Sequence, residues 1–165
     1  MDEFLTNLQN SDFGVWVSSA PTIFAYPTIL MLHTVGLAMV VGPIACLSLR
    51  LLGVGQPRMP VSIFRGVFKI MWWGFALNAT TGVMLFISEA DDKGLQIDFY
   101  VKLTLIAFAL WAAMRMKRVI FTGRDDAAVD SMVPAQAKSL AVVSLLLWSG
   151  AITAGRLMAY LKGQI

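Results

Sequence analysis

Four long apolar stretches constrain the fold of this chain more than any other feature of its sequence. They run over about residues 23–47, 64–87, 99–121 and 140–161. Each is long enough to cross the hydrocarbon core of a bilayer as a helix, which takes about 20 apolar residues. Backbone groups in lipid must be hydrogen-bonded within the chain, and a helix does this within one segment. The stretches therefore predict an all-α fold, a transmembrane four-helix bundle.

The apolar share of the chain excludes an ordinary soluble domain. Hydrophobic residues make up 58% of the 165 residues and charged residues 14%, whereas soluble domains have about 45–50% and about 25%. The connections between the stretches are short, so residues 1–165 are expected to form a single membrane domain. The acidic, polar start of the chain lacks the basic and apolar pattern of a signal peptide.

The segment before the first apolar stretch mixes apolar and polar residues over positions 2–17. Its apolar residues recur at spacings typical of an amphipathic helix, and they are Phe4, Leu5, Leu8, Phe13, Val15 and Trp16. Such a helix lies in the plane of the membrane surface. We therefore predict an N-terminal interfacial helix, with Asn10-Ser11-Asp12 placed either to break it or to cap a second turn.

Basic residues gather in two of the connections, and this predicts the orientation. They are Arg50, Arg58, Arg65 and Lys69 around the first connection, and Arg115, Lys117, Arg118 and Arg124 around the third. Acidic residues dominate the N-terminus and the second connection. Connections rich in lysine and arginine stay in the cytoplasm. We expect a multi-pass protein of a bacterial inner membrane with both termini outside. Basic residues at helix ends do not form the continuous face that a nucleic-acid partner needs.

His33 is the single histidine of the chain and lies about ten residues into the first stretch. At about 1.5 Å per residue this depth is roughly 15 Å below the outer surface. Polar groups at such depth usually face a bundle interior or a site. A neutral imidazole there can bind haem iron or another transition metal. It can equally hold helices together through a hydrogen bond to a threonine or a carbonyl, and spacing alone leaves both open.

Three further residues are candidates for binding a haem on His33. Gly36 follows almost one turn later and leaves room either for a flat macrocycle or for a close helix neighbour. Arg156, about five residues from the outer end of the fourth stretch, can pair with a haem propionate or extend to the membrane surface. Lys102, near the outer start of the third stretch, has the same two alternatives.

Ten methionines raise the question of copper. Thioethers bind Cu(I) and can complete the coordination of haem iron, but methionine is also a common apolar filler. Met84, in the outer half of the second stretch, is the candidate for a second axial ligand.

Cys46 lies in an apolar helix, where we expect a buried and inert thiol. The sequence has no glycine-rich phosphate loop, and its acids lie outside the spans, which argues against proton-coupled transport.

The residues also resemble a known family. YPTILMLHTVGLAMVVGPIACLSLRLLG resembles the first helix of a large bacterial family of small four-helix membrane proteins of unassigned function, including its Arg-Leu-Leu-Gly exit. WWGFALNATTGVMLFISEA, FYVKLTLIAFALWAA and AGRLMAY resemble its later helices, so the resemblance extends from about Trp16 to nearly the end of the chain. It implies the four-helix fold and no particular chemistry.

Two better-characterised groups are similar to this pattern at a greater distance. Copper-resistance D-type membrane domains share the histidine helix, the Thr81-Gly82 pair and the position of Lys102, which implies copper. The membrane-embedded protoporphyrinogen oxidase family is a small helical bundle with haem b, which implies haem. This chain lacks the additional histidine and methionine clusters of the first group and the further histidines of the second.

These observations predict a b-type haem protein for electron transfer or redox sensing near the outer face. His33 is the expected proximal ligand, and Arg156 and Lys102 are expected to neutralise the propionates. The first alternative is transport of copper or a small solute, and the second is a structural subunit of a larger membrane complex. Glycine faces predict a homo-oligomer or larger complex, through Gly36, Gly42, Gly82, Gly150 and Gly155.

Overall fold

The computed structural model describes residues 2–55, 59–94 and 96–161, which form helices and connections with no β-strand among them. The short helices are α1 (Asp2–Gln9), α2 (Asp12–Ser19), the 3-10 helix η1 (Val61–Gly66), α5 (Ala90–Gly94) and α7 (Asp126–Ser131). The long helices are α3 (Tyr26–Leu51), α4 (Val67–Ile87), α6 (Ile97–Phe121) and α8 (Ala135–Leu161).

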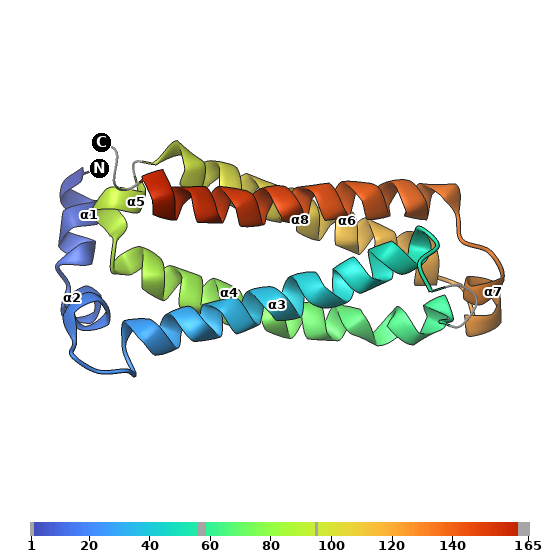
Figure 1. Cartoon of the computed structure of the whole chain (residues 1–165), viewed down its shortest axis with the longest axis horizontal. Helices are drawn as coiled ribbons and strands as arrows, with labels where there is room; N and C mark the ends of the chain where they lie inside the picture. The colour runs from blue at the N-terminus through green and yellow to red at the C-terminus, as the bar shows by residue number, and fades with distance from the viewer. Residues whose placement is uncertain (1, 56–58, 95, 162–165) are drawn as a thin grey trace.

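Four helical segments are long and apolar enough to cross a membrane, namely α3, η1 with α4, α6 and α8. They lie side by side as a bundle (Figure 1), which confirms the predicted all-α four-helix fold. Their bounds differ from the predicted ranges by two to five residues, at the start of each helix and at the end of α3, which continues to Leu51. α3 begins at Tyr26 because Pro27 suits the first turn of a helix. α8 begins at Ala135, directly after Pro134, because residues 135–139 favour helix although they are not uniformly apolar.

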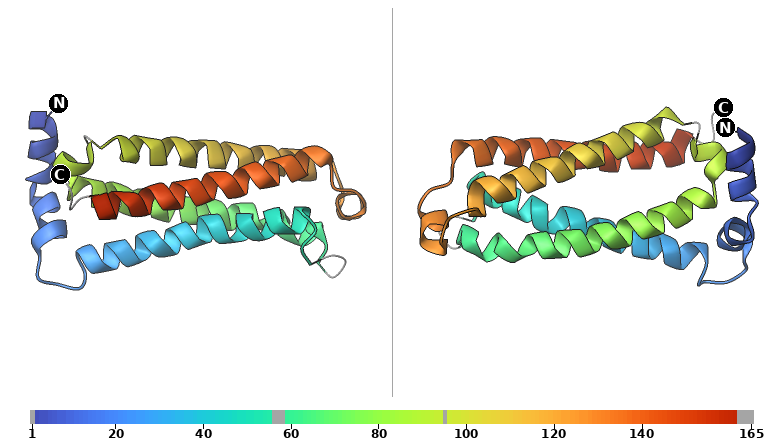
Figure 2. Two further views of the ribbon diagram at one scale, coloured as in Figure 1. Left: turned by 45° about the horizontal axis from the view of Figure 1, so that its top comes forward. Right: turned by 180° about the vertical axis from the view of Figure 1, so that it is seen from behind.

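The N-terminal segment forms two helices, not one. The Ser11 hydroxyl accepts a hydrogen bond from the Gly14 amide at 3.2 Å, which caps the start of α2. The Asn10-Ser11-Asp12 sequence thus ends one helix and begins the next. Both helices lie across one end of the bundle (Figures 1 and 2). α1 packs on α5 there, where Leu5 covers Gly94.

The bundle has two different ends. We call the end with α1, α2 and α5 the terminal end, because α1 begins and α8 finishes there (Figure 1). The other end carries η1 and α7 and is called the α7 end. The basic connections lie at the α7 end, where Arg65 pairs with Asp126 at 2.8 Å. Arg58 lies outside the described residues.

The two halves of the bundle are packed differently. α3 packs along α4, α6 packs along α8, and α3 also contacts α8. The main hydrophobic core fills the half nearer the α7 end, where Leu47, Phe68 and Met116 are almost fully buried. Toward the terminal end α4 and α6 separate (Figure 2, right). In the terminal half a cavity lies between the α3–α4 pair and the α6–α8 pair.

Cys46 is exposed on α3, so the expectation of a buried thiol is wrong. The neighbouring positions Ile44 and Leu47 point into the core, whereas Cys46 points away from it. In a membrane helix an apolar neighbourhood does not imply burial, because the lipid-facing side is apolar as well.

Candidate functional site

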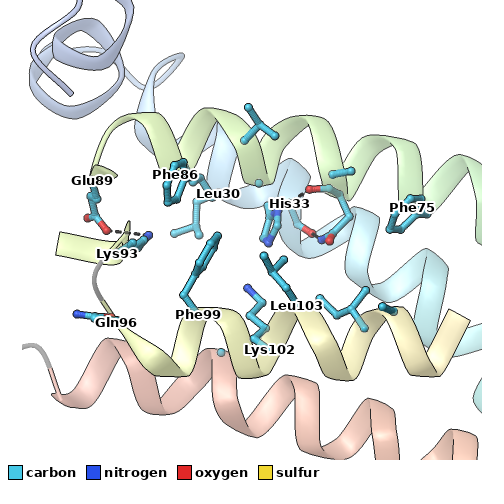
Figure 3. Close-up of a pocket in the computed structure, with 18 of the residues that line it drawn as sticks. Leu30, His33, Phe75, Phe86, Glu89, Lys93, Gln96, Phe99, Lys102 and Leu103 are labelled. Carbon is cyan, nitrogen blue, oxygen red and sulfur yellow. Dashed lines mark hydrogen bonds and ion pairs between the residues drawn. The ribbon is translucent and has the colours of Figure 1, made fainter. Parts of the chain in front are cut away.

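A cavity of about 780 Å³ fills the space between the helix pairs in the terminal half. This volume lies within the range of about 300–1,000 Å³ typical of small-molecule sites. Aliphatic and aromatic side chains make most of its wall, with a few polar groups among them (Figure 3). The polar lining residues are Tyr26, His33, Asn78, Glu89, Lys93, Gln96 and Lys102.

His33 projects from α3 into this cavity and is half-buried (Figure 3). Its Nδ1 lies 3.0 Å from the Asn78 carbonyl oxygen and 3.1 Å from the Thr81 hydroxyl. A carbonyl oxygen only accepts, so Nδ1 carries the proton of the neutral ring. The Thr81 hydroxyl donates to the Leu77 carbonyl at 2.7 Å and can therefore accept from the same Nδ1–H. Nε2 keeps its lone pair and has no hydrogen-bond partner among the described residues.

The backbones of α3 and α4 meet closely beside His33, which holds this geometry. The Asn78 side-chain amide donates to the His33 carbonyl at 2.7 Å, so the two residues bind each other in both directions. A Cβ on Gly36 would lie 2.7 Å from the backbone nitrogen of Asn78. A Cβ on Gly74 would lie 2.5 Å from the Cβ of Met39. Glycine is needed at both positions of this crossing. Gly36 thus lies at a helix contact and not on the cavity wall.

Gly82 lies directly against the His33 ring, a role that sequence reasoning missed. A Cβ at this position would be 3.1 Å from His33 Cε1 and 3.6 Å from Nδ1. Gly82 follows Asn78 by one turn of α4, so both residues face the same side. The sequence signal for this role is the spacing of Asn78 and Gly82 on one helix face, but only the pairing of α3 with α4 makes it informative.

Lys102 reaches across the cavity from α6, and its amine points toward His33 (Figure 3). Its side chain passes over Gly155 of α8, where a Cβ would lie 3.5–3.6 Å from the last three side-chain atoms of Lys102. Within the described part of the chain, no ion pair or hydrogen bond involves this amine. Lys102 is therefore a half-buried cation inside a largely apolar cavity.

Arg156 and Met84 are placed away from the cavity. Arg156 follows Gly155 on α8, but its side chain is exposed and does not line the cavity wall. Met84 packs against Val17 and Ile29 on another side of α4. It follows Gly82 by two residues, which turns it about 200° around the helix from the face toward His33. The structure therefore brings together His33 and Lys102, and it brings neither Arg156 nor Met84 to them.

The terminal end of the cavity is lined by groups that the sequence did not single out. The rings of Phe86 and Phe99 stack with centroids 5.0 Å apart. Beyond them Glu89, which directly precedes α5, forms an ion pair at 2.7 Å with Lys93, one helical turn later in α5 (Figure 3). These residues form the part of the cavity wall nearest the end of the bundle.

The donor set of the cavity suits a metal macrocycle better than a bare metal ion. Among the described residues, no three His, Cys, Asp or Glu side chains gather closely enough to hold an ion. Among the described residues that line the cavity there is no methionine or cysteine, so His33 is the one soft or borderline ligand in this part of the wall. A haem brings four nitrogens of its own and needs only one or two from the protein. His33 Nε2 can supply one of them, and Lys102 offers a positive charge for a carboxylate.

Comparisons of the chain with models of protein families, with curated proteins and with solved structures found no match. The assignment of function therefore depends on the geometry of the cavity.

Proposed function

We propose that this membrane protein binds haem b in the cavity and serves in electron transfer or redox sensing. The observation that supports this most is the lone pair of His33 Nε2, which faces a cavity of about 780 Å³ while Nδ1 is held by Asn78. When bound, haem supplies one-electron chemistry at its iron. The contribution of the chain is to present the imidazole, to fix its tautomer through Asn78 and Thr81, and to exclude water with apolar walls.

Lys102 is the residue that we assign to the charge of the propionates. A carboxylate in an apolar cavity is unfavourable unless it is paired and hydrogen-bonded. The Lys102 amine lies on the same cavity as His33 and lacks a partner within the described residues. Arg156 was expected to share this role, but its exposed position suits the membrane surface better.

An absorption spectrum of the purified protein, made with ample haem, tests the proposal. We expect a Soret band in the wild type and its loss in His33→Ala, because the variant removes the only imidazole. Thr34→Ala is the matched control, since Thr34 is the next residue of α3 but is exposed and bonds to Leu30 of its own helix. A wild type without a Soret band, or a band of full strength in His33→Ala, would refute haem binding.

We further propose that the chain resides in a bacterial inner membrane with the terminal end outside. The support is the distribution of charge: the connections at the α7 end carry most of the basic residues, and such connections remain in the cytoplasm. In this orientation the haem site lies in the outer half of the bilayer, near electron partners outside the cell.

The sequence-based reason for an oligomer is weaker in the structure. Four of the five glycines that suggested association between chains have neighbours within the chain, and only Gly42 faces open space. The outward surface, with Trp73 at 75% exposure and Leu146 at 68%, suits lipid as well as another subunit. A role as a structural subunit therefore stays a secondary proposal, with no contact in the structure to favour it.

A further inference from the structure

The wall of the cavity between α4 and α6 is open to the side of the bundle. These two helices separate along the cavity, whereas the other neighbouring pairs pack together (Figure 2). Ala79 and Val83 of α4, and Leu103 and Ala107 of α6, line the cavity and are also exposed. Val83 is 59% exposed and Leu103 46%. We call these four residues the lateral rim.

The lateral rim lies at the depth of the hydrocarbon region. Ala79 precedes the last residue of α4 by eight residues, which is about 12 Å of helix. A membrane span buries about 30 Å, so the rim faces acyl chains and not headgroups. Each side of the rim consists of two apolar residues one helical turn apart, which offers no polar group to water.

The end of the cavity that faces water is crossed by interacting side chains instead. Phe86 and Phe99 stack across it, and the ion pair of Glu89 with Lys93 lies beyond them. α1 holds α5 over this end, where the Asp91 amide donates to the Gln9 side chain at 2.9 Å. A ligand from water must displace these contacts, whereas a ligand from the bilayer meets only the apolar lateral rim.

The interior indicates what kind of ligand enters. Apolar residues surround most of the cavity, and Lys102 contributes a cation that has no acidic partner among the residues that the structure describes. Charge complementarity therefore favours an anionic group beside Lys102 and an apolar body toward the lateral rim.

We propose that the cavity is filled from the lipid phase, between α4 and α6, by an amphiphile that carries a carboxylate. This inference uses the same cavity as the proposed haem function and deepens it, because haem itself has an apolar ring and carboxylate propionates. It does not require iron or His33. The carboxylate pairs with Lys102, and the apolar part lies between Val83 and Leu103.

Photolabelling in proteoliposomes tests this inference without haem. The probe is stearic acid with a photoreactive diazirine on its chain, and the comparison probe is the alcohol of equal length. We expect the acid to label cavity residues of α4 and α6 about tenfold more than the alcohol does, since a charge-assisted contact distinguishes them. Lys102→Met should remove this difference, and Lys102→Gln is a second variant in case the first folds poorly.

A second pair of variants tests the lateral route. Val83→Trp fills the rim and should reduce labelling of the cavity by about tenfold, whereas Val35→Trp should leave it unchanged. Val35 is the matched control because it is 44% exposed on α3 and does not line the cavity. Labelling of the outward-facing Leu146 on α8 reports that each variant is folded and inserted.

Two results would overturn the inference: equal labelling of the cavity by acid and alcohol, or labelling that Val83→Trp leaves unchanged. These results are independent of the Soret band. A protein that takes the acid but no haem supports lateral entry and refutes the proposed function. A protein that binds haem but excludes the acid supports the proposed function and refutes lateral entry.

Discussion

A neutral imidazole has one ring proton, and in His33 the Asn78 carbonyl determines which nitrogen carries it. A metal-binding histidine is usually oriented in this way, by an acceptor on its second nitrogen. Here the acceptor is a main-chain group of α4, so the orientation of the ring depends on how α3 and α4 pack. Small residues between the two helices are therefore expected to affect the site as strongly as the polar ones.

Substitution of Gly82 tests this dependence at the level of one residue. In Gly82→Val the new side chain meets His33 Cε1, where even a Cβ would lie at 3.1 Å. The ring must turn, and its bonds to Asn78 and Thr81 weaken. We expect haem affinity to fall by about 10–100-fold, the usual effect of disturbing such a partner, as measured by Soret titration. Gly42→Val is the control, because a Cβ there meets nothing within 4 Å. Equal affinities of the two variants would contradict the prediction.

His33 and Lys102 could be predicted from the sequence, but the rest of the site could not. Charged and imidazole groups are rare in membrane spans, so each is noticeable by itself. Arg156 was equally noticeable, and Met84 was selected by its place in the outer half of its span, yet the structure places both elsewhere. The sequence cannot separate these cases, because cavity-facing and lipid-facing positions of a span are both apolar. The hydrophobic periodicity of a span is therefore weak, and it does not indicate which way a side chain points.

At the scale of elements, the crossing of α3 and α4 is the most closely packed contact beside the site. Gly36 and Gly74 allow the two backbones to approach, and small residues commonly have this role between membrane helices. The helices themselves were predictable, since length and hydropathy specify a span. Their pairing was not, because glycines that suit contact within the chain equally suit contact between chains.

Gly74→Val is expected to separate α3 from α4. A Cβ on Gly74 would lie 2.5 Å from the Met39 Cβ and 2.9 Å from its carbonyl carbon, so backbone has to move. Overpacking of this kind costs about 1–3 kcal/mol. We expect a lower midpoint of thermal unfolding in detergent than for Gly42→Val, which carries the same change in helix propensity at an open position. Unfolding midpoints that agree would argue against the crossing.

The contact between η1 and α7 depends on pH. Asp130 accepts hydrogen bonds from the Ser62 amide at 2.9 Å and from the Ser62 hydroxyl at 2.7 Å. These bonds, the amide first, hold the pKa of the Asp130 carboxyl below its usual range. A carboxyl with a lowered pKa in the folded state stabilises the fold above the unfolded pKa. This stabilisation is lost as the pH falls through the folded pKa.

The variant Asp130→Asn should therefore differ from the wild type only while the carboxylate is ionised. We expect a lower unfolding midpoint for the variant at neutral pH, and a difference that shrinks below about pH 4. Ser62→Ala, which removes one of the two donors, should lose part of the same pH-dependent difference. A difference that is constant from neutral to acidic pH would show that the charge of Asp130 has no part in this contact.

On the scale of the whole molecule, packing and charge are both unequal along the axis of the bundle. The half nearer the α7 end has a closed apolar core, and the terminal half has the cavity. Basic residues concentrate at the α7 end, beside the half that has the closed apolar core. If these residues stay in the cytoplasm, the cavity lies toward the outside. The orientation of the bundle therefore determines in which half of the bilayer the cavity lies.

The orientation can be measured with single cysteines, because the chain has only Cys46 of its own. In a Cys46→Ser background, Ile97→Cys places a thiol at the terminal end and Met132→Cys places one at the α7 end. These positions form a matched pair, since Ile97 is 79% exposed and Met132 is 64% exposed. The reagent is a maleimide that cannot cross the inner membrane, applied to bacterial cells with a permeable outer membrane. We expect labelling at position 97 in intact cells and at position 132 only after the inner membrane is disrupted. Labelling in the opposite order would place the cavity in the cytoplasmic half, where lateral entry would draw on the inner leaflet instead.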